Sequence, residues 1–271
     1  MAVKGVYTAL SGAIAQSAKM DTIANNMANV NTPAFKRDTQ LFQEYVTAHE
    51  KEPPVTPIPR DVASIESFYD MQGGDKAYVD LRGTFTDFSQ GSLKHTGNKF
   101  DVALDGKGFF EVMTPNGVRL TRAGNFTLDG NGQLVTKDGY PVLLAGAADA
   151  DPASRVIRAE GGGDFNVSDQ GDISVGGEPL GRFSVVNVLN PDSLIKQGQN
   201  LYNFKANMAP ELETIAVPSM KQGFVEGSNV NIVQEMTDMI QTQRVFESTQ
   251  KAISAYDSMS DKAVNVVGKT N

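Results

Sequence analysis

The chain has 271 residues, of which 40% are apolar; this suffices for one large domain or two smaller ones and excludes disorder throughout. Its 24 basic and 32 acidic side chains give a net charge of -8, which repels polyanions and excludes nucleic acid as a natural partner. The absence of cysteine excludes disulfide bonds and thiolate metal sites.

The charge is unevenly distributed along the chain. Residues 49–218 hold 15 basic and 23 acidic side chains, whereas the two ends together hold nine of each sign. Near-neutral segments pack together without strong repulsion, and an acidic segment favours contact with solvent. We therefore expect ends that pack against each other and a middle that faces outward.

Residues 1–35 are predicted to form an N-terminal assembly helix. Its apolar residues follow alternating steps of three and four, interrupted only by Ser17, a spacing typical of one helix packing on another: Val3, Val6, Leu10, Ala13, Met20, Ala24 and Met27. The helix should end near Asn31, because Thr32 precedes Pro33 and is disfavoured in the α region. Asn29 or Asn31 is expected to adopt the left-handed cap.

The opening of the chain lacks the long apolar core of a signal peptide, and no run of about 18 apolar residues occurs anywhere. We therefore expect no membrane insertion, and any export must use a route without a cleaved signal. Residues 36–92 contain Pro53-Pro54, Pro57, Pro59 and Gly73-Gly74, a composition that interrupts regular structure. They are predicted to form an extended connector with little core of its own.

Residues 93–217 are predicted to form one all-β domain. Short runs rich in β-branched and aromatic residues occur at 100–104, 108–113, 118–121, 125–128, 133–136 and 182–188. They alternate with dipeptides that tolerate positive φ and indicate hairpin turns: Asn116-Gly117, Asp129-Gly130, Asn131-Gly132 and Asp138-Gly139. With helices at both ends, the fold class is α+β.

Residues 218–271 are predicted to form a C-terminal assembly helix that packs with residues 1–35. Apolar side chains recur on the same series of three- and four-residue steps, with Thr242, Thr249 and Ser260 filling gaps in it: Ile232, Met239, Phe246, Ile253, Tyr256, Ala263 and Val267. No helix breaker occurs between Val230 and Val267, and about 37 residues at 1.5 Å each give a helix of roughly 55 Å, a length typical of coiled coils.

A helical apolar stripe is compatible with ordinary intramolecular core as well as with an assembly seam. The length of the helices and their placement at both chain ends favour assembly. The candidate interface residues are Val6, Leu10, Met20, Met27, Ile232, Met239, Phe246, Ile253 and Tyr256.

Enzymatic and metal-binding motifs are incomplete. His49 and His95 lack a partner at metal-ligand spacing, and Gly106-Lys-Gly108 lacks the third glycine of a dinucleotide loop. The turn at Asp129 lacks the further ligands of a calcium loop, and Asp169 with Asp172 is more simply a solvated pair than a glycosidase dyad. We therefore expect no catalytic residue, cofactor, metal or small-molecule substrate.

Three segments together resemble the flagellar rod and hook family. They are the Asn-rich helix stop at 25–37, the β pattern at 101–112 and 120–136, and the stretch at 223–231 with the helix at 235–247. Within the family, the opening of the chain and residues 235–240 are most similar to proximal rod proteins and next to distal ones. One departure is Ala34, where the family usually has glycine, so the sequence argues against positive φ there.

The resemblance implies a subunit that passes unfolded through the flagellar type III export apparatus without a cleaved signal. Such a subunit assembles helically with copies of itself and with other rod proteins, spans the periplasm in the basal body, and transmits motor torque to the hook. Two alternatives are a distal rod or hook subunit of the same family, and a secreted β-rich module that binds carbohydrate or a cell surface. The second would need an aromatic-lined pocket on the β domain.

Overall fold

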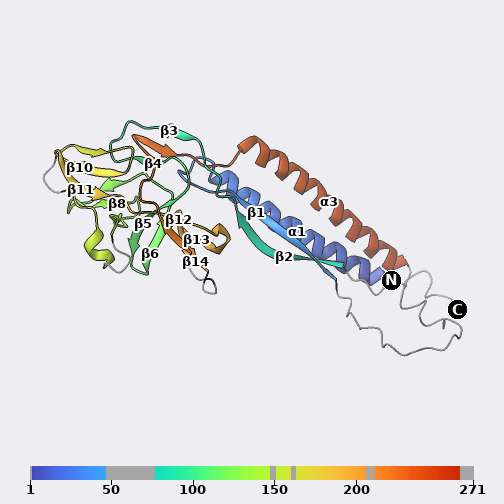
Figure 1. Cartoon of the computed structure of the whole chain (residues 1–271). Helices are drawn as coiled ribbons and strands as arrows, with labels where there is room; N and C mark the ends of the chain where they lie inside the picture. The colour runs from blue at the N-terminus through green and yellow to red at the C-terminus, as the bar shows by residue number, and fades with distance from the viewer. Residues whose placement is uncertain are drawn as a thin grey trace, which may run out of the picture. The chain divides into compact units, whose positions relative to one another are not determined.

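The computed structural model describes residues 2–46, 77–146, 151–159, 163–205, 208 and 211–262 (Figure 1). His49, the prolines and glycine pair of the predicted connector, Ala263 and Val267 lie outside these residues. The described chain divides into two compact units. The first contains most of both long helices together with strands β1 and β2, and the second contains Asn26–Arg37 and Thr86–Ile232.

The helix-bearing unit is built from residues near the two chain ends. Helix α1 spans Ala2–Ala28, and helix α3 spans Ile232–Lys262. Strands β1 (Asp38–Val46) and β2 (Ala77–Thr86) pair in a two-stranded sheet. The hydroxyl of Thr22 donates a 3.0 Å hydrogen bond to Gln40 Oε1, which joins α1 to β1. The predicted connector therefore begins and ends in paired strands, which its proline and glycine content did not indicate.

A six-stranded antiparallel sheet organises the β-rich unit. Its strand order is β13-β14-β6-β5-β12-β15. The strands span Phe109–Thr114 (β5), Gly117–Thr121 (β6), Val185–Val188 (β12), Leu194–Gly198 (β13), Leu201–Phe204 (β14) and Leu212–Thr214 (β15). The turn between β5 and β6 uses Gly117 at φ 97, as the sequence predicts.

Smaller sheets complete the same unit. A three-stranded sheet, ordered β11-β10-β9, contains Phe165–Val167 (β9), Asp172–Val175 (β10) and Glu178–Arg182 (β11). Three strand pairs join β3 (Leu93–His95) to β17 (Phe224–Glu226), β4 (Val102–Leu104) to β16 (Met220–Gln222), and β7 (Thr127–Leu128) to β8 (Leu134–Val135). Short 3₁₀ helices span Pro152–Arg155 and Pro191–Ser193.

The core of the β-rich unit is aromatic at its centre. Phe110 is fully buried, and its ring packs edge-on against Phe126 at 5.3 Å and Phe183 at 5.6 Å. The β-rich unit extends past the predicted limits of 93–217, because β16 and β17 pair with strands at its start and Asn26–Arg37 also belongs to it. The α+β class is confirmed.

Candidate assembly faces and a buried ionic junction

The predicted seam of the C-terminal helix is the covered side of α3. Met239, Phe246, Ile253 and Tyr256 are all half-buried. Glu235 and Thr242, which fall in the same three- and four-residue series, are buried. Ile232 differs, because it lies at the start of α3 and is exposed. The pattern in the sequence therefore identifies the side of α3 that is covered in the subunit.

The predicted seam of the N-terminal helix is covered in part. Ala13 is buried and Val6, Met20 and Met27 are half-buried, but Leu10 is exposed. Ala15 and Ile23, which lie outside the predicted steps, are also buried. The covered part of α1 is therefore wider than the predicted seam.

Both helices also present an exposed apolar stripe. On α1 it consists of Tyr7, Leu10 and Ile14, and on α3 of Val233, Met236 and Ile240. Each stripe follows steps of three and four, so its members lie along one side of their helix. Ile14 is 56% exposed and Val233 is 69% exposed. We call these the α1 stripe and the α3 stripe.

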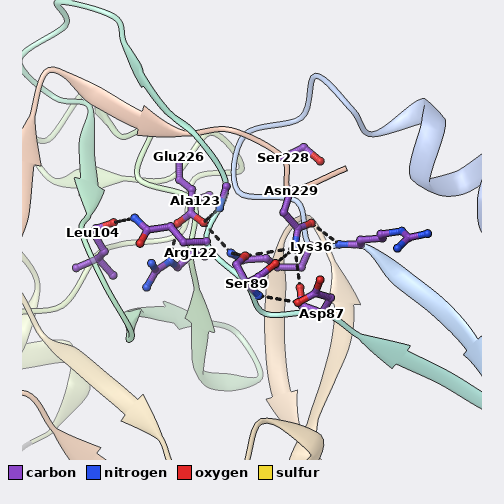
Figure 2. A network of polar contacts seen from close by, with 12 residues as sticks. Lys36, Asp87, Ser89, Leu104, Arg122, Ala123, Glu226, Ser228 and Asn229 are labelled. Carbon is purple, nitrogen blue, oxygen red and sulfur yellow. Dashed lines mark hydrogen bonds and ion pairs between the residues drawn. The ribbon is translucent and has the colours of Figure 1, made fainter. Parts of the chain in front are cut away.

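The β-rich unit contains a buried ionic cluster formed by Lys36, Arg122 and Glu226, which we call the Glu226 junction (Figure 2). One oxygen of Glu226, Oε1, lies 2.6 Å from Lys36 Nζ. The other, Oε2, lies 2.6 Å from Arg122 Nε. The three residues are 1%, 4% and 1% exposed in chain order, so a single carboxylate bridges two cations away from solvent.

Further hydrogen bonds satisfy the charged groups of the junction. Lys36 Nζ donates to the carbonyl of Ser89 at 2.7 Å, and the amide of Gly91 donates to Glu226 Oε1 at 2.9 Å. The guanidinium of Arg122 donates to the carbonyls of Gly106 and Gly108. Both glycines have positive φ, which allows this short loop to turn its carbonyls toward Arg122. Such pairing is what a buried charge requires.

Burial lowers the pKa of Lys36, because removal from water disfavours the ammonium form. The ion pair with Glu226 opposes this by raising the pKa, while the nearby charge of Arg122 lowers it. The charge state of Lys36 therefore depends on Glu226.

Three separate pieces of chain meet at the junction. The amide of Ala34 donates to the carbonyl of Glu226 at 2.8 Å, and the amide of Arg37 donates to Asn229 Oδ1 at 2.7 Å. Asn229 Nδ2 in turn donates to the carbonyl of Asp87 at 2.8 Å (Figure 2). Residues 34–37, 87–91 and 226–229 are thus joined by hydrogen bonds in addition to the ion pairs.

Ala34 corrects two expectations from the sequence. It has a φ of 58°, although an alanine there argued against positive φ. Among the described non-glycine residues only Ala34, Gln199 and Asn200 have positive φ, so neither Asn29 nor Asn31 forms the left-handed cap. The hydrogen bond from Ala34 to Glu226 and its complete burial hold this conformation in place.

Three of the residues considered for chemistry, Asp129, Asp172 and His95, have structural partners. Asp129 Oδ1 accepts from the amides of Asn131 and Gln133, both at 2.8 Å, and so closes a turn. These bonds lower the pKa of Asp129. Asp172 pairs with Arg182 at 2.7 Å, and the ring of His95 packs against Phe224. Within the described residues no group of side chains is arranged to hold a metal ion, and no helix there is long and apolar enough to cross a bilayer.

A cavity of about 430 Å³ lies beside the junction and includes Phe88 and Phe109 in its lining. These two rings pack on each other at 5.7 Å and on Tyr202 at 5.4 and 5.5 Å. Phe109 and Tyr202 are buried, and both belong to the core of the β-rich unit.

Comparison with known families accounts for all three segments of the resemblance. Residues 6–36 match the family described as flagella basal body rod protein. Residues 103–175 match the flagellar hook protein FlgE/F/G D1 domain, and residues 221–266 match the flagellar basal body rod FlgEFG protein C-terminal region.

Individual relatives align over nearly the whole chain. Flagellar basal-body rod protein FlgF of Caulobacter vibrioides is 33% identical over 266 residues, which cover 98% of each chain. FlgG of Buchnera aphidicola from Schizaphis graminum is 32% identical, covering 96% of this chain and 98% of the relative, and FlgG of Bacillus subtilis is 31% identical, covering 97% and 99%. The chain therefore belongs to the flagellar basal-body rod FlgE/F/G family and is a structural subunit of the flagellum.

Proposed function

We propose that this chain polymerises with copies of itself and with other rod proteins into the shaft that carries motor torque across the periplasm to the hook. The observation that carries the proposal is the pair of exposed stripes on α1 and α3. Burying one large apolar side chain contributes roughly 1.5–3 kcal/mol, so covering both stripes at every subunit favours assembly strongly. The names of the relatives support a place in the basal-body rod.

Within the subunit, we assign the half-buried residues to contacts between the two terminal helices. This set is Val6, Met20, Met239, Phe246, Ile253 and Tyr256; Met27 lies in the part of α1 that belongs to the β-rich unit and is not assigned to these contacts. Leu10 and Ile232, which are exposed, are assigned to contacts with neighbouring subunits. The terminal helices would then form a coiled-coil-like inner layer, with the acidic β-rich unit on the outside of the shaft.

Export through the flagellar type III apparatus, without a cleaved signal, is part of the same proposal. Relatives named FlgF and FlgG match at similar identity, so the comparison favours neither position in the rod. A proximal position stays our prediction from the opening of the chain and residues 235–240, with a distal position as the alternative.

The test is Ile240→Asp in a motile host that lacks its own copy of this chain. Ile240 is exposed, so the substitution leaves the subunit folded but places a carboxylate in the α3 stripe. We expect loss of swimming and at least a tenfold reduction of the subunit in purified basal bodies. Gln241→Asp adds the same charge at an exposed polar position and should assemble normally. Normal incorporation of Ile240→Asp would refute the proposed interface.

A further inference from the structure

The Glu226 junction gathers one residue from each part of the chain that matches a rod family. Lys36 lies in the match over residues 6–36, Arg122 in that over 103–175, and Glu226 in that over 221–266. The ion pairs join residues 190 and 104 positions apart in the sequence. The three matching regions therefore converge on one carboxylate.

The chain pieces at the junction adjoin three of the four places where the chain crosses between the two units. The four boundaries fall at Asn25/Asn26, Arg37/Asp38, Phe85/Thr86 and Ile232/Val233. The pieces 34–37, 87–91 and 226–229 each lie within a few residues of one of the last three boundaries, on the side of the β-rich unit. A force carried along the backbone across one of these three boundaries therefore passes through the adjoining piece.

Glu226 contacts all of these pieces and links them to the sheet. Its carboxylate binds Lys36 in the first piece and the amide of Gly91 in the second, while its own backbone belongs to the third. Through Arg122 it reaches the end of β6 and the carbonyls of Gly106 and Gly108, just before β5. The open end of the β5–β6 hairpin, where β5 begins and β6 ends, is thereby connected to the three chain pieces.

A buried ionic contact is suited to holding the three chain pieces in a fixed position on the β5–β6 hairpin. Apolar side chains can slide past one another at modest cost, whereas a buried carboxylate that moves away from its cations leaves uncompensated charges out of reach of water. We propose that Glu226 is a positioning residue that fixes the three connecting pieces to the β5–β6 hairpin, so that load entering along one piece is shared by all of them. The role under load rests on the proposed rod function; the positioning role does not.

The first test is native-state hydrogen exchange on the full chain carrying Glu226→Gln. This substitution keeps the shape of the side chain but leaves two buried cations without a carboxylate. We expect exchange to accelerate roughly 100-fold or more at the amides of Ala34, Arg37 and Gly91. The amides of the paired strands β5 and β6 should keep their protection. Equal acceleration throughout the β-rich unit, or none, would overturn the inference.

Glu111→Gln is the matched control. Glu111 forms a partly buried ion pair with Arg155 at 3.1 Å and accepts a hydrogen bond from Ser184, all within the β-rich unit but away from the connecting pieces. Its loss should accelerate exchange near Arg155 and Ser184 and leave Ala34 and Gly91 unchanged. Acceleration at Ala34 and Gly91 in this control equal to that in Glu226→Gln would also overturn the inference.

Lys36→Met covers the case in which Glu226→Gln does not fold. It removes one cation, fills a similar volume, and leaves Arg122 and Glu226 as a neutral pair. Exchange should accelerate at Ala34 and Arg37 by roughly tenfold, while the amide of Gly227, which donates to the carbonyl of Ser92 at 2.8 Å, stays protected. Unchanged exchange at residues 34–37 would overturn the assignment.

The role under load is tested by swimming in media of increasing viscosity. A strain carrying Glu226→Gln should incorporate the subunit and swim in thin medium, but lose speed more steeply than wild type as viscosity rises. Parallel viscosity curves would overturn the role under load. Failure of the wild-type chain to restore motility would instead refute the proposed rod function and leave the exchange result standing.

Discussion

The two compact units differ in how their large apolar side chains are arranged. In the β-rich unit Phe110, Phe165 and Phe183 are almost fully inaccessible to solvent, and the buried Glu226 is paired with two cations, although Leu189 is exposed. In the helix-bearing unit the exposed apolar side chains follow the α1 and α3 stripes, where Ile14 and Val233 remain more than half exposed. The comparison indicates that the β-rich unit completes its core within a single chain, whereas the helices have apolar stripes left for partners.

The largest effect on this comparison is expected from Phe110→Ala. Removing a fully buried phenylalanine and its two edge-on ring contacts should lower the free energy of unfolding of the β-rich unit by about 3–5 kcal/mol. Urea denaturation of the full chain measures the change. Leu189→Ala is the control, because Leu189 is exposed and its loss should cost less than about 0.5 kcal/mol. Equal effects of the two substitutions would contradict a complete β core.

The second largest effect is expected from Phe246→Asp on the covered side of α3. A carboxylate at this half-buried position should destabilise the helix-bearing unit by about 2–3 kcal/mol and abolish incorporation into the rod. The thermal melt of the β-rich unit should be unchanged. Ser248→Asp places the same charge at an exposed position of α3 and should assemble. Normal motility of Phe246→Asp, or a melt of the β-rich unit that falls with it, would show that the seam is misassigned.

A smaller effect is expected from Ala34→Gly at the junction. Glycine removes the strain of an alanine at positive φ, which costs about 1 kcal/mol or more. The substitution also removes a buried methyl group and gives the unfolded chain more conformational freedom, and both of these effects destabilise the fold. These contributions should cancel to within about 1 kcal/mol. Ala34→Val adds a β-branched side chain at positive φ and should cost clearly more. A large stabilisation by Ala34→Gly, seen in the midpoint of urea denaturation, would contradict this balance.

The smallest effect concerns the ion pair of Asp172 with Arg182 on the surface of the β-rich unit. The hydrogen bond from Arg182 lowers the pKa of Asp172 below its usual 3.8. The stabilisation of the folded state by this ion pair is therefore fully present above pH 3.8 and is lost as the pH falls through the lowered pKa of Asp172. The melting temperature of Asp172→Asn should lie slightly below that of wild type near neutral pH and converge with it in strong acid. High salt should also reduce the difference. A difference that persists in strong acid would exclude this ion pair as its cause.

Local patterns predict much of the fold. Strands β4 to β8 and β12 fall on the predicted runs, and Gly117, Gly132 and Gly139 have the positive φ that their dipeptides predict. Gly130 does not, because Asp129 accepts two amides and sets a different turn. Strands β1 and β2 were missed because 30 residues separate Val46 from Ala77, and a partner at that distance leaves no local signal.

Local sequence patterns predict the assembly faces only in part and do not predict the Glu226 junction. Large residues at regular steps identify the covered side of α3, whereas on α1 the same steps include the buried Ala13 but also the exposed Leu10, and they omit the buried Ala15 and Ile23. Arg122 and Glu226 lie in apolar, strand-like runs, where a charge more often faces solvent. Their pairing depends on contacts over 104 residues of sequence, which periodicity does not contain.

If the helix-bearing unit supplies the contacts between subunits and the β-rich unit is already complete, the two units should respond differently to assembly. Hydrogen exchange of the chain, measured as a monomer and as an assembled rod, distinguishes them. We expect the amides of α1 around Tyr7 to Ile14 and of α3 around Val233 to Ile240 to gain strong protection on assembly. The amides of β5 and β6 should be unchanged. Protection gained mainly in the β-rich unit, with both helices exchanging as in the monomer, would contradict this expectation.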